Sequence, residues 1–205
     1  MPLHSSTCDY DSDLTGGPLM VRESRIVAEL LLADVDDAAW KAAIIDDNCL
    51  QKTRPATARR VAQAIRQRLA RLPSPFWRAL CDGDEQFATQ LAFCAALVRN
   101  RLLLEFLEVV VADAFVVQAE TLKPWQWEEF LEERSSRDPA IARWSASTRK
   151  KIRQVAFRML YEVGLIADNH HRQIQPLIVR DDVLTLLEHH HLDRIRRCLL
   201  ALRPR

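Results

Sequence analysis

Apolar residues recur at intervals of three and four along most of this chain, which is the spacing that places side chains on one face of an α-helix. The pattern predicts an all-α, mainly helical protein, and the presence of only four glycines among 205 residues agrees with that fold class. The expected helices cover approximately residues 22–33, 37–46, 57–72, 75–81, 85–98, 102–118, 139–144, 145–163, 182–187 and 192–202, with a further helix that begins at residue 124.

The helix on which the functional interpretation depends is expected between Ser145 and Gly164. Ser145, Ser147 or Thr148 can cap its first turn, because a side-chain oxygen there accepts a backbone N–H that has no partner within the helix. Gly164 suits the left-handed residue that follows a last helical turn. The residues expected to face the core are Ile152, Val155, Ala156, Met159 and Val163.

The residues after this helix predict a different element. A polar segment leads to the short apolar stretch 173–179, which is typical of a chain that turns back as a strand. We therefore expect a short β wing near residues 165–179, so that helix and wing together form a winged helix-turn-helix-like unit.

The predicted elements suggest a division of the chain into three parts. The first is a flexible tail over residues 1–20, which are polar and acidic and contain two adjacent glycines. The second is an N-terminal helical domain with helix-turn-helix-like helices over 21–120. The third is the winged-helix-turn-helix-like domain over 121–205.

The side of the 145–163 helix that faces away from its apolar stripe is basic. It carries Lys150, Arg153 and Gln154, with Arg149 beside them. Arginine and lysine suit phosphate or guanine and glutamine suits adenine, so this face is a candidate reader of the DNA major groove. The same pattern is equally typical of a basic face that is only solvated.

The predicted helix 57–72 has a similar pattern, with an apolar stripe on one side and Arg59, Arg60 and Arg66 outside it. As the third of three short helices, it can complete another helix-turn-helix-like unit. The alternative is a helical bundle whose third helix is only made soluble by arginine. Contact with phosphates is favoured over reading of bases, because each neutralised phosphate adds affinity by counterion release.

Charge is strongly segregated along the chain, although the net charge is only +1. Residues 1–47 hold three bases and ten acids, and residues 82–133 hold three bases and eleven acids. Residues 48–81 hold eight bases and no acid, and residues 134–205 hold fifteen bases and seven acids. Two basic blocks of this kind can build a basic surface on a protein of nearly neutral charge.

Motifs of common catalytic sites are missing from the sequence. There is no G-x-x-x-x-G-K-[ST] loop, no G-x-G-x-x-G and no H-E-x-x-H. His189, His190 and His191 are consecutive, so on a helix they point in different directions and do not match the spacing of metal ligands. We expect no enzymatic activity, no metal or other cofactor, and no small-molecule substrate.

Cysteine spacing and hydropathy bear on the cellular setting. The five cysteines are far apart, with no C-x-x-C pair and no signal peptide, which predicts a reducing, cytoplasmic environment. The most apolar run, 102–117, is interrupted by Glu105, Glu108 and Asp113 and is shorter than the roughly 18 uninterrupted apolar residues that a membrane span needs. We therefore expect no membrane partner.

Four segments carry a resemblance to a known family. In chain order they are Glu23–Leu32, Asn48–Gln51 with Thr57–Val61 and Arg68–Leu69, Leu103–Val110, and Trp144–Ile166 with Ile174–Pro176. Their order and spacing resemble the BrxA family, the small component of bacterial BREX phage-defence systems. The resemblance covers approximately residues 22–187, and no single segment is as specific as a zinc signature.

The resemblance implies an all-helical protein with helix-turn-helix elements that binds double-stranded DNA and accompanies other BREX proteins. Combined with the basic helices, it predicts DNA contacts from Arg59, Arg60, Arg66, Thr148, Arg149, Lys150, Arg153, Gln154 and Arg172. One alternative is a protein–protein adaptor that assembles BREX components and binds nucleic acid weakly or not at all. RNA binding is a third hypothesis, disfavoured because the predicted fold lacks the stacking sheet common in readers of single strands.

Overall fold

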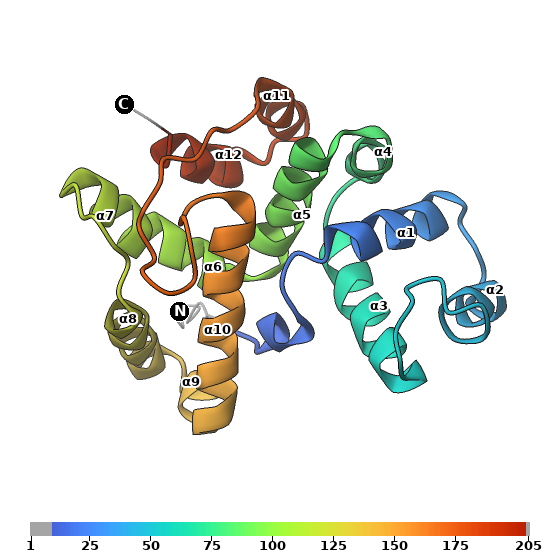
Figure 1. The fold of residues 1–205 in the computed structure, drawn as a ribbon, viewed down its shortest axis with the longest axis horizontal. Coiled ribbons are helices and arrows are strands. Elements are labelled where there is room, and N and C mark those ends of the chain that lie inside the picture. The colour runs from blue at the N-terminus through green and yellow to red at the C-terminus, as the bar shows by residue number, and fades with distance from the viewer. Residues whose placement is uncertain (1–9, 204–205) are drawn as a thin grey trace, which may run out of the picture.

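The computed structural model describes residues 10–203, and the elements of this part of the chain are helical (Figure 1). The N-terminal half begins with a short 3-10 helix and includes one π-helical turn, η2. Its elements are η1 (Asp13–Gly16), α1 (Val21–Leu32), α2 (Asp37–Lys41), η2 (Ala42–Asp46), α3 (Pro55–Leu69), α4 (Ser74–Asp82) and α5 (Glu85–Arg99).

The second half contains one long helix interrupted by a π-helical turn, followed by five further helices. The interrupted helix consists of α6 (Arg101–Phe106), η3 (Leu107–Val111) and α7 (Ala112–Val116). The others are α8 (Pro124–Arg137), α9 (Pro139–Ala142), α10 (Ala146–Val163), α11 (Asp181–His189) and α12 (Asp193–Ala201). The predicted all-α fold class is confirmed by these elements.

Polar side chains begin several of the helices, as the sequence predicts for Ser145. The Ser145 hydroxyl oxygen accepts the Thr148 N–H at 3.1 Å, and the carboxylates of Asp36 and Asp84 cap α2 and α5 in the same way. At the other end of α10, Gly164 has φ of 89°, the left-handed conformation that glycine adopts without a steric cost. Local sequence therefore fixes both ends of α10.

The core is organised around α5, which lies in the middle of Figure 1 and contacts α1, α3, α4, α10, α11 and α12. Gln90 to Leu97 are all buried. Hydrophobic side chains from Tyr10 to Leu202 form one continuous cluster around this helix. The predicted division of the chain near residue 120 stays a prediction.

The segment that precedes α1 is packed on the rest of the protein. Tyr10, Leu14 and Leu19 are buried, although the sequence assigns them to a flexible tail. The Tyr10 hydroxyl donates to Glu105 at 2.6 Å, and Arg134 donates to the same carboxylate oxygen at 2.8 Å. The remainder of the predicted tail, residues 1–9, lies outside the described residues.

The predicted β wing near residues 165–179 is wrong. Within residues 10–203 no strand forms, and this segment contains only isolated bridges, Ile166 with Ile174 and Thr121 with Gln173. The segment is an irregular loop that returns from the end of α10 to α11.

Two local features stop the ladder after one bridge. At its start, the Leu165 and Ile166 N–H groups donate to the Leu160 carbonyl at 2.8 and 3.4 Å, because they complete the end of α10. On the returning side, the Gln175 N–H bonds to the Leu165 carbonyl, but the next N–H that could face the same partner, that of Leu177, donates to the Leu202 carbonyl at 2.8 Å. The apolar residues of this stretch instead pack on the core, where Leu177 and Val179 are buried.

No helix in the described part of the chain is long and apolar enough to cross a membrane. The same residues contain no group of three or more His, Cys, Asp or Glu side chains that could hold a metal ion.

Candidate nucleic-acid interface

The predicted apolar stripe of α10 faces the core, since Ile152, Val155, Ala156, Met159 and Val163 are all buried. Opposite this stripe, Lys150, Lys151 and Gln154 are exposed. Neither lysine has an ion pair among the described residues. The outward edge of α10 therefore presents two uncompensated positive charges and one amide to solvent.

Thr148 takes part in the helix cap. Its hydroxyl lies 2.9 Å from the Ser145 hydroxyl, and its N–H donates to the same oxygen. The side chain is half-buried at the first turn of α10, so its local role is to help begin the helix.

Arg149 and Arg153 are held by carboxylates of the neighbouring helix α8. Arg149 pairs with Glu132 at 3.3 Å, and Arg153 pairs with Glu128. Glu128 and Glu132 are four residues apart, so they lie on one face of α8, and the two arginines are likewise four apart on α10. These two predicted contact residues are largely neutralised by the protein itself.

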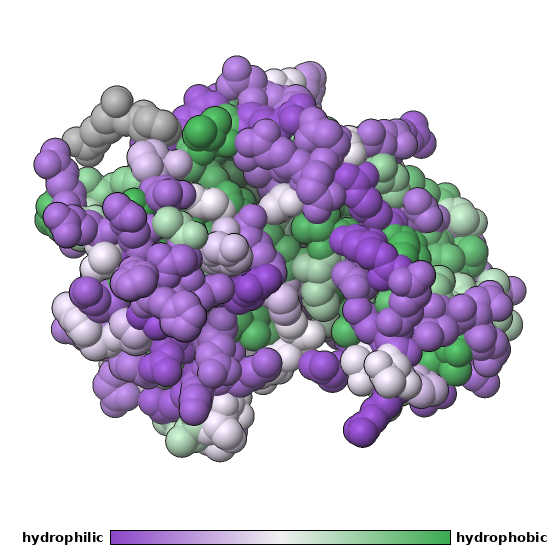
Figure 2. Space-filling model, viewed as in Figure 1, coloured by the Kyte–Doolittle hydropathy of each residue, from purple (hydrophilic) through white to green (hydrophobic). Residues whose placement is uncertain are grey.

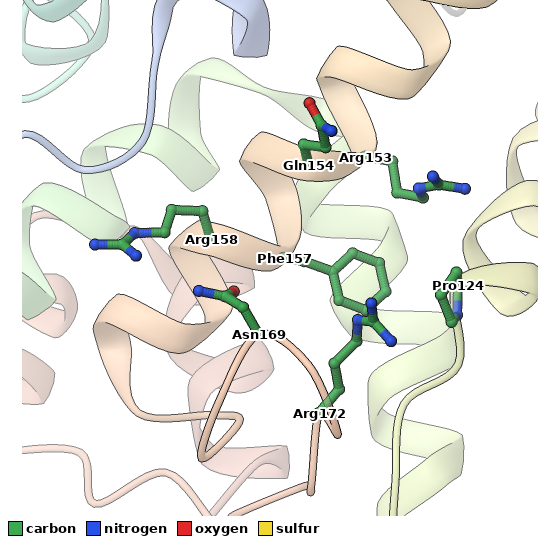
Figure 3. Close-up of a pocket in the computed structure, with 7 residues that line it drawn as sticks. All are labelled: Pro124, Arg153, Gln154, Phe157, Arg158, Asn169 and Arg172. Atoms are coloured by element: carbon green, nitrogen blue, oxygen red, sulfur yellow. The ribbon is translucent and has the colours of Figure 1, made fainter.

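A hollow of about 290 Å³ lies beside this edge of α10 (Figure 3). Figure 3 shows that side chains from α10 and from the loop after it surround the hollow, with Pro124 at its far side. The lining residues are Pro124, Arg153, Gln154, Phe157, Arg158, Asn169 and Arg172. The structure thus brings together three of the predicted contact residues, namely Arg153, Gln154 and Arg172.

The loop that carries Arg172 is built by a turn around Asp168. The Asp168 carboxylate accepts the backbone N–H groups of His170 and His171, both at 2.6 Å, and these bonds lower the pKa of Asp168. The turn brings the Arg172 guanidinium 5.5 Å from the centre of the Phe157 ring. This contact orients a cation over the hollow without neutralising its charge.

The three predicted contact residues of α3 have no carboxylate partner among the described residues. Arg59 is exposed and has no ion pair among the described residues. Arg60 donates to the Thr15 carbonyl at 3.2 Å, and Arg66 lies 4.5 Å from the centre of the Trp40 ring. Neither the carbonyl nor the ring supplies a negative charge, so none of the three arginines is compensated by an acid among the described residues.

One base of the same block has a structural role. Arg68 is buried and donates to the Gly17 and Pro18 carbonyls, each at 2.6 Å. Burial lowers the pKa of its guanidinium to about 10. The side chain fixes the segment before α1 to α3, and it is not available to a ligand.

Comparison with known proteins identifies the family. The BrxA family model matches residues 8–191. The chain belongs to the BrxA family. The protein named "BREX protein BrxA" from Paramagnetospirillum magneticum is 35% identical over 190 residues, which are 93% of this chain and 96% of that protein.

Other BrxA relatives show similar coverage. The protein of the same name from Escherichia coli O9:H4 (strain HS) is 35% identical over 86% of this chain and 83% of its own. A crystal structure of an uncharacterized protein from Magnetospirillum magneticum matches with a TM-score of 0.85 and 33% identity, covering 93% of this chain and 97% of that one. The arrangement of helices in this BrxA-family chain is therefore shared with a solved structure.

The predicted contact residues of this BrxA-family chain fall into two groups on either side of η1. Both α3 and α10 contact η1, and Figure 1 shows this short blue helix between them. Seen from the same direction, the surface over α8, α9 and α10 is mostly hydrophilic (Figure 2). The hollow beside α10 contains none of the α3 arginines.

Three further candidate contact residues on this surface were not predicted from the sequence. Lys151 is exposed on the outward edge of α10, and Arg158 and Asn169 line the hollow. A spacing of seven places Lys151 and Arg158 on one side of the helix, which is a signal that the sequence contains. Asn169 carries no such signal, because its position depends on the turn around Asp168.

Proposed function

We propose that this protein binds double-stranded DNA as an accessory component of a BREX defence system and catalyses no reaction itself. Membership of the BrxA family makes it a BREX component. The observation that carries the DNA-binding proposal is the outward edge of α10, where Lys150 and Lys151 are exposed and have no acidic partner among the described residues.

Further support comes from the other cations near this edge. Arg172 stands over the neighbouring hollow on the Phe157 ring, and Arg59, Arg60 and Arg66 of α3 have no carboxylate partner within the described residues. Each cation that neutralises a phosphate releases condensed counterions, and this release supplies most of the affinity for any duplex sequence. Gln154, exposed between these charges, is the residue best suited to contact a base edge.

The ion pairs of Arg149 and Arg153 determine which substitutions test the proposal. These arginines must exchange a carboxylate for a phosphate, so the net gain on binding DNA is small. Lys150 and Lys151 lose no carboxylate partner when they bind a phosphate, because neither contacts an acid among the described residues. We therefore expect the lysines to contribute more to affinity than the two arginines.

The direct test is the double substitution Lys150→Glu with Lys151→Glu. We expect it to weaken binding to a duplex by about a hundredfold at low salt, because two phosphate contacts become repulsive. Fluorescence anisotropy with a labelled duplex measures the affinity, and circular dichroism checks that the helices remain.

The matched control is Arg197→Glu on α12, an exposed cation without an ion pair among the described residues. It changes charge in the same direction but lies away from α10 and α3, so we expect a much smaller loss. The double variant makes two such charge reversals and Arg197→Glu makes one, so a loss of binding free energy in Arg197→Glu that is half that of the double variant would mean that only net charge matters. Failure of the wild-type protein to bind duplex at low salt would end the proposal.

A second candidate function is that of an adaptor that assembles other BREX proteins. It is favoured by exposed apolar side chains outside the α10 surface, of which Trp125 on α8 is the largest. Co-purification with a BREX protein that survives nuclease treatment and the Lys150→Glu substitution would support this function. Loss of the complex after nuclease treatment would show that DNA, and not a protein contact, joins the two.

A further inference from the structure

Exposed apolar side chains are concentrated in one region of the protein. Large hydrophobic residues that are exposed within the described chain number six, and four of them lie on η3, at the end of α7 and at the start of α8. These four are Val109, Val116, Val117 and Trp125, of which Trp125 is 61% and Val109 is 48% exposed. In Figure 2 hydrophobic residues emerge at the left edge, where Figure 1 places α7.

Two of these residues border a groove between η3–α7 and α8, with a volume of about 440 Å³. We call it the α7–α8 groove, and its lining residues are Val109, Val110, Asp113, Trp125, Gln126, Glu129, Phe130 and Glu133. Val110 and Phe130 also pack on the core, so the apolar part of the groove rests on buried structure. A groove of this volume holds one or two large side chains of a partner.

The rim of the groove is acidic. Asp113 and Glu129 are exposed and have no ion pair among the described residues. Glu133 is shared between Arg134 at 3.0 Å and Arg137 at 2.6 Å. The rim therefore carries at least two uncompensated negative charges next to exposed apolar surface.

Helix α8 separates this groove from the basic edge of α10. Glu128 and Glu132 turn toward α10, where they pair with its arginines. Glu129 and Glu133 are displaced by one residue, about 100° around the helix, and line the groove. The acids of α8 therefore form two rows with different surroundings: both members of one row pair with α10, whereas in the other row Glu133 pairs within α8 and Glu129 has no ion pair among the described residues.

The opposite wall of the groove contains an irregular element. η3 is a π-helical turn within an otherwise α-helical stretch, and it bears Val109 and Val110. Such turns are rare inside α-helices and occur frequently at functional sites. This second observation falls on the same surface as the exposed apolar residues.

We propose that the α7–α8 groove binds a positively charged amphipathic segment of another protein. An apolar side chain of that segment packs beside Trp125 and Val109, and its lysines or arginines face Asp113 and Glu129. Helices commonly dock in this way, with apolar anchors one turn apart in a groove and charges at its rim. The proposal gives the adaptor function a surface, and it stands independently of DNA binding, since none of the predicted DNA contacts lines this groove.

The experiment uses the full chain and two synthetic helical peptides of roughly 18 residues, or five turns. Both carry leucine at helical spacing of three and four, and they differ only in having lysine or glutamate at all other positions. We expect the lysine peptide to bind about tenfold or more tightly than the glutamate peptide, because like charges at the rim repel the latter. Isothermal titration calorimetry measures both affinities.

Variants then locate the binding. Trp125→Ala removes the largest exposed anchor, and we expect about tenfold weaker binding of the lysine peptide. Asp113→Lys with Glu129→Lys reverses the rim charge, and we expect the preference to switch to the glutamate peptide. Ile178→Ala and Glu29→Lys are matched controls, because both side chains are exposed and lie outside the groove.

Several outcomes would overturn the proposal. One is that neither peptide binds. Another is that the groove variants bind the lysine peptide as tightly as the wild type does. A third is that the control variants lose as much affinity for the lysine peptide as the groove variants do. Self-association in sedimentation that Trp125→Ala abolishes would mean that a second copy of this chain occupies the groove. Duplex binding, measured in parallel, is expected to survive Trp125→Ala, so failure of one proposal is distinguishable from failure of the other.

Discussion

At the scale of single residues, the half-buried acid Asp13 makes stability depend on pH. Burial, and after it the neighbouring Asp11 carboxylate, raise the pKa of its carboxyl to about 6. The Asn100 amide donates to it, and Arg99 lies 3.6 Å away, but these contacts do not outweigh burial. Because the ordinary value is 3.8, folding favours the protonated form.

This shift predicts a pH-dependent effect of Asp13→Asn. A carboxyl whose pKa is raised in the folded state loses stability as pH rises from about 4 to 6, and the full cost is present above pH 6. The amide has no charge to bury, so we expect the variant to gain stability of the order of 1 kcal/mol at pH 8 and little at pH 4. Urea unfolding at the two pH values measures this difference.

The same substitution at Asp46, an exposed carboxylate in η2, provides the comparison. It should change stability little at either pH. Equal effects of the two substitutions, or a loss of stability in Asp13→Asn that is larger at pH 8, would contradict the explanation from burial.

Local chemistry at this scale was largely predictable from the sequence. Ser145 as a cap, Gly164 as the end of α10 and the buried stripe of α10 are all found in the structure. The partners of Arg149 and Arg153 were not predictable, because Glu132 and Glu128 lie 17 and 25 positions away in the sequence. Helical periodicity assigns a residue to a face, but it does not say which neighbouring helix that face meets.

At the scale of elements, the pairing of α8 with α10 leads to a further prediction. The carboxylates of α8 neutralise Arg149 and Arg153 of α10. Removing them by Glu128→Gln with Glu132→Gln should therefore strengthen duplex binding by about tenfold at low salt. Exposed ion pairs of this kind contribute less than about 1 kcal/mol each, so the fold should persist. Anisotropy titrations and circular dichroism measure the two effects.

A charge-matched control exists in the same region. Asp113→Asn with Glu129→Gln also removes two negative charges, but these acids line the α7–α8 groove and contact no α10 arginine. We expect this pair to change affinity much less. Equal gains in both variants would show that long-range charge, and not release of Arg149 and Arg153, explains the effect.

The wing was the element that sequence reasoning assigned incorrectly. Its apolar residues are spaced as in a short strand, yet Leu177 and Val179 are buried in the helical core. Strand pairing also requires free N–H groups on both sides, but the Leu165 N–H bonds to Leu160 at the end of α10 and the Leu177 N–H bonds to Leu202. The pattern of apolar residues thus described burial correctly but not backbone pairing.

At the scale of the whole molecule, the sequence located both basic blocks but not their arrangement. The blocks belong to α3 and α10, and η1 lies between these helices. Nothing in the periodicity of the chain indicates that the segment before α1 would fill this place, held by Arg68 and Glu105. Long-range contacts of this kind depend on the complete fold.

The most direct test of DNA binding by both helices is the salt dependence of affinity for one duplex. We would measure it for the wild type, for Lys150→Gln with Lys151→Gln, for Arg59→Gln with Arg60→Gln, and for all four together. Each lost phosphate contact should reduce the slope of log affinity against log salt concentration by about 0.9. We expect a shallower slope in each double variant and the shallowest in the combination. A slope unchanged by the α3 or the α10 substitutions, or no duplex binding at low salt, would contradict a shared DNA-binding surface.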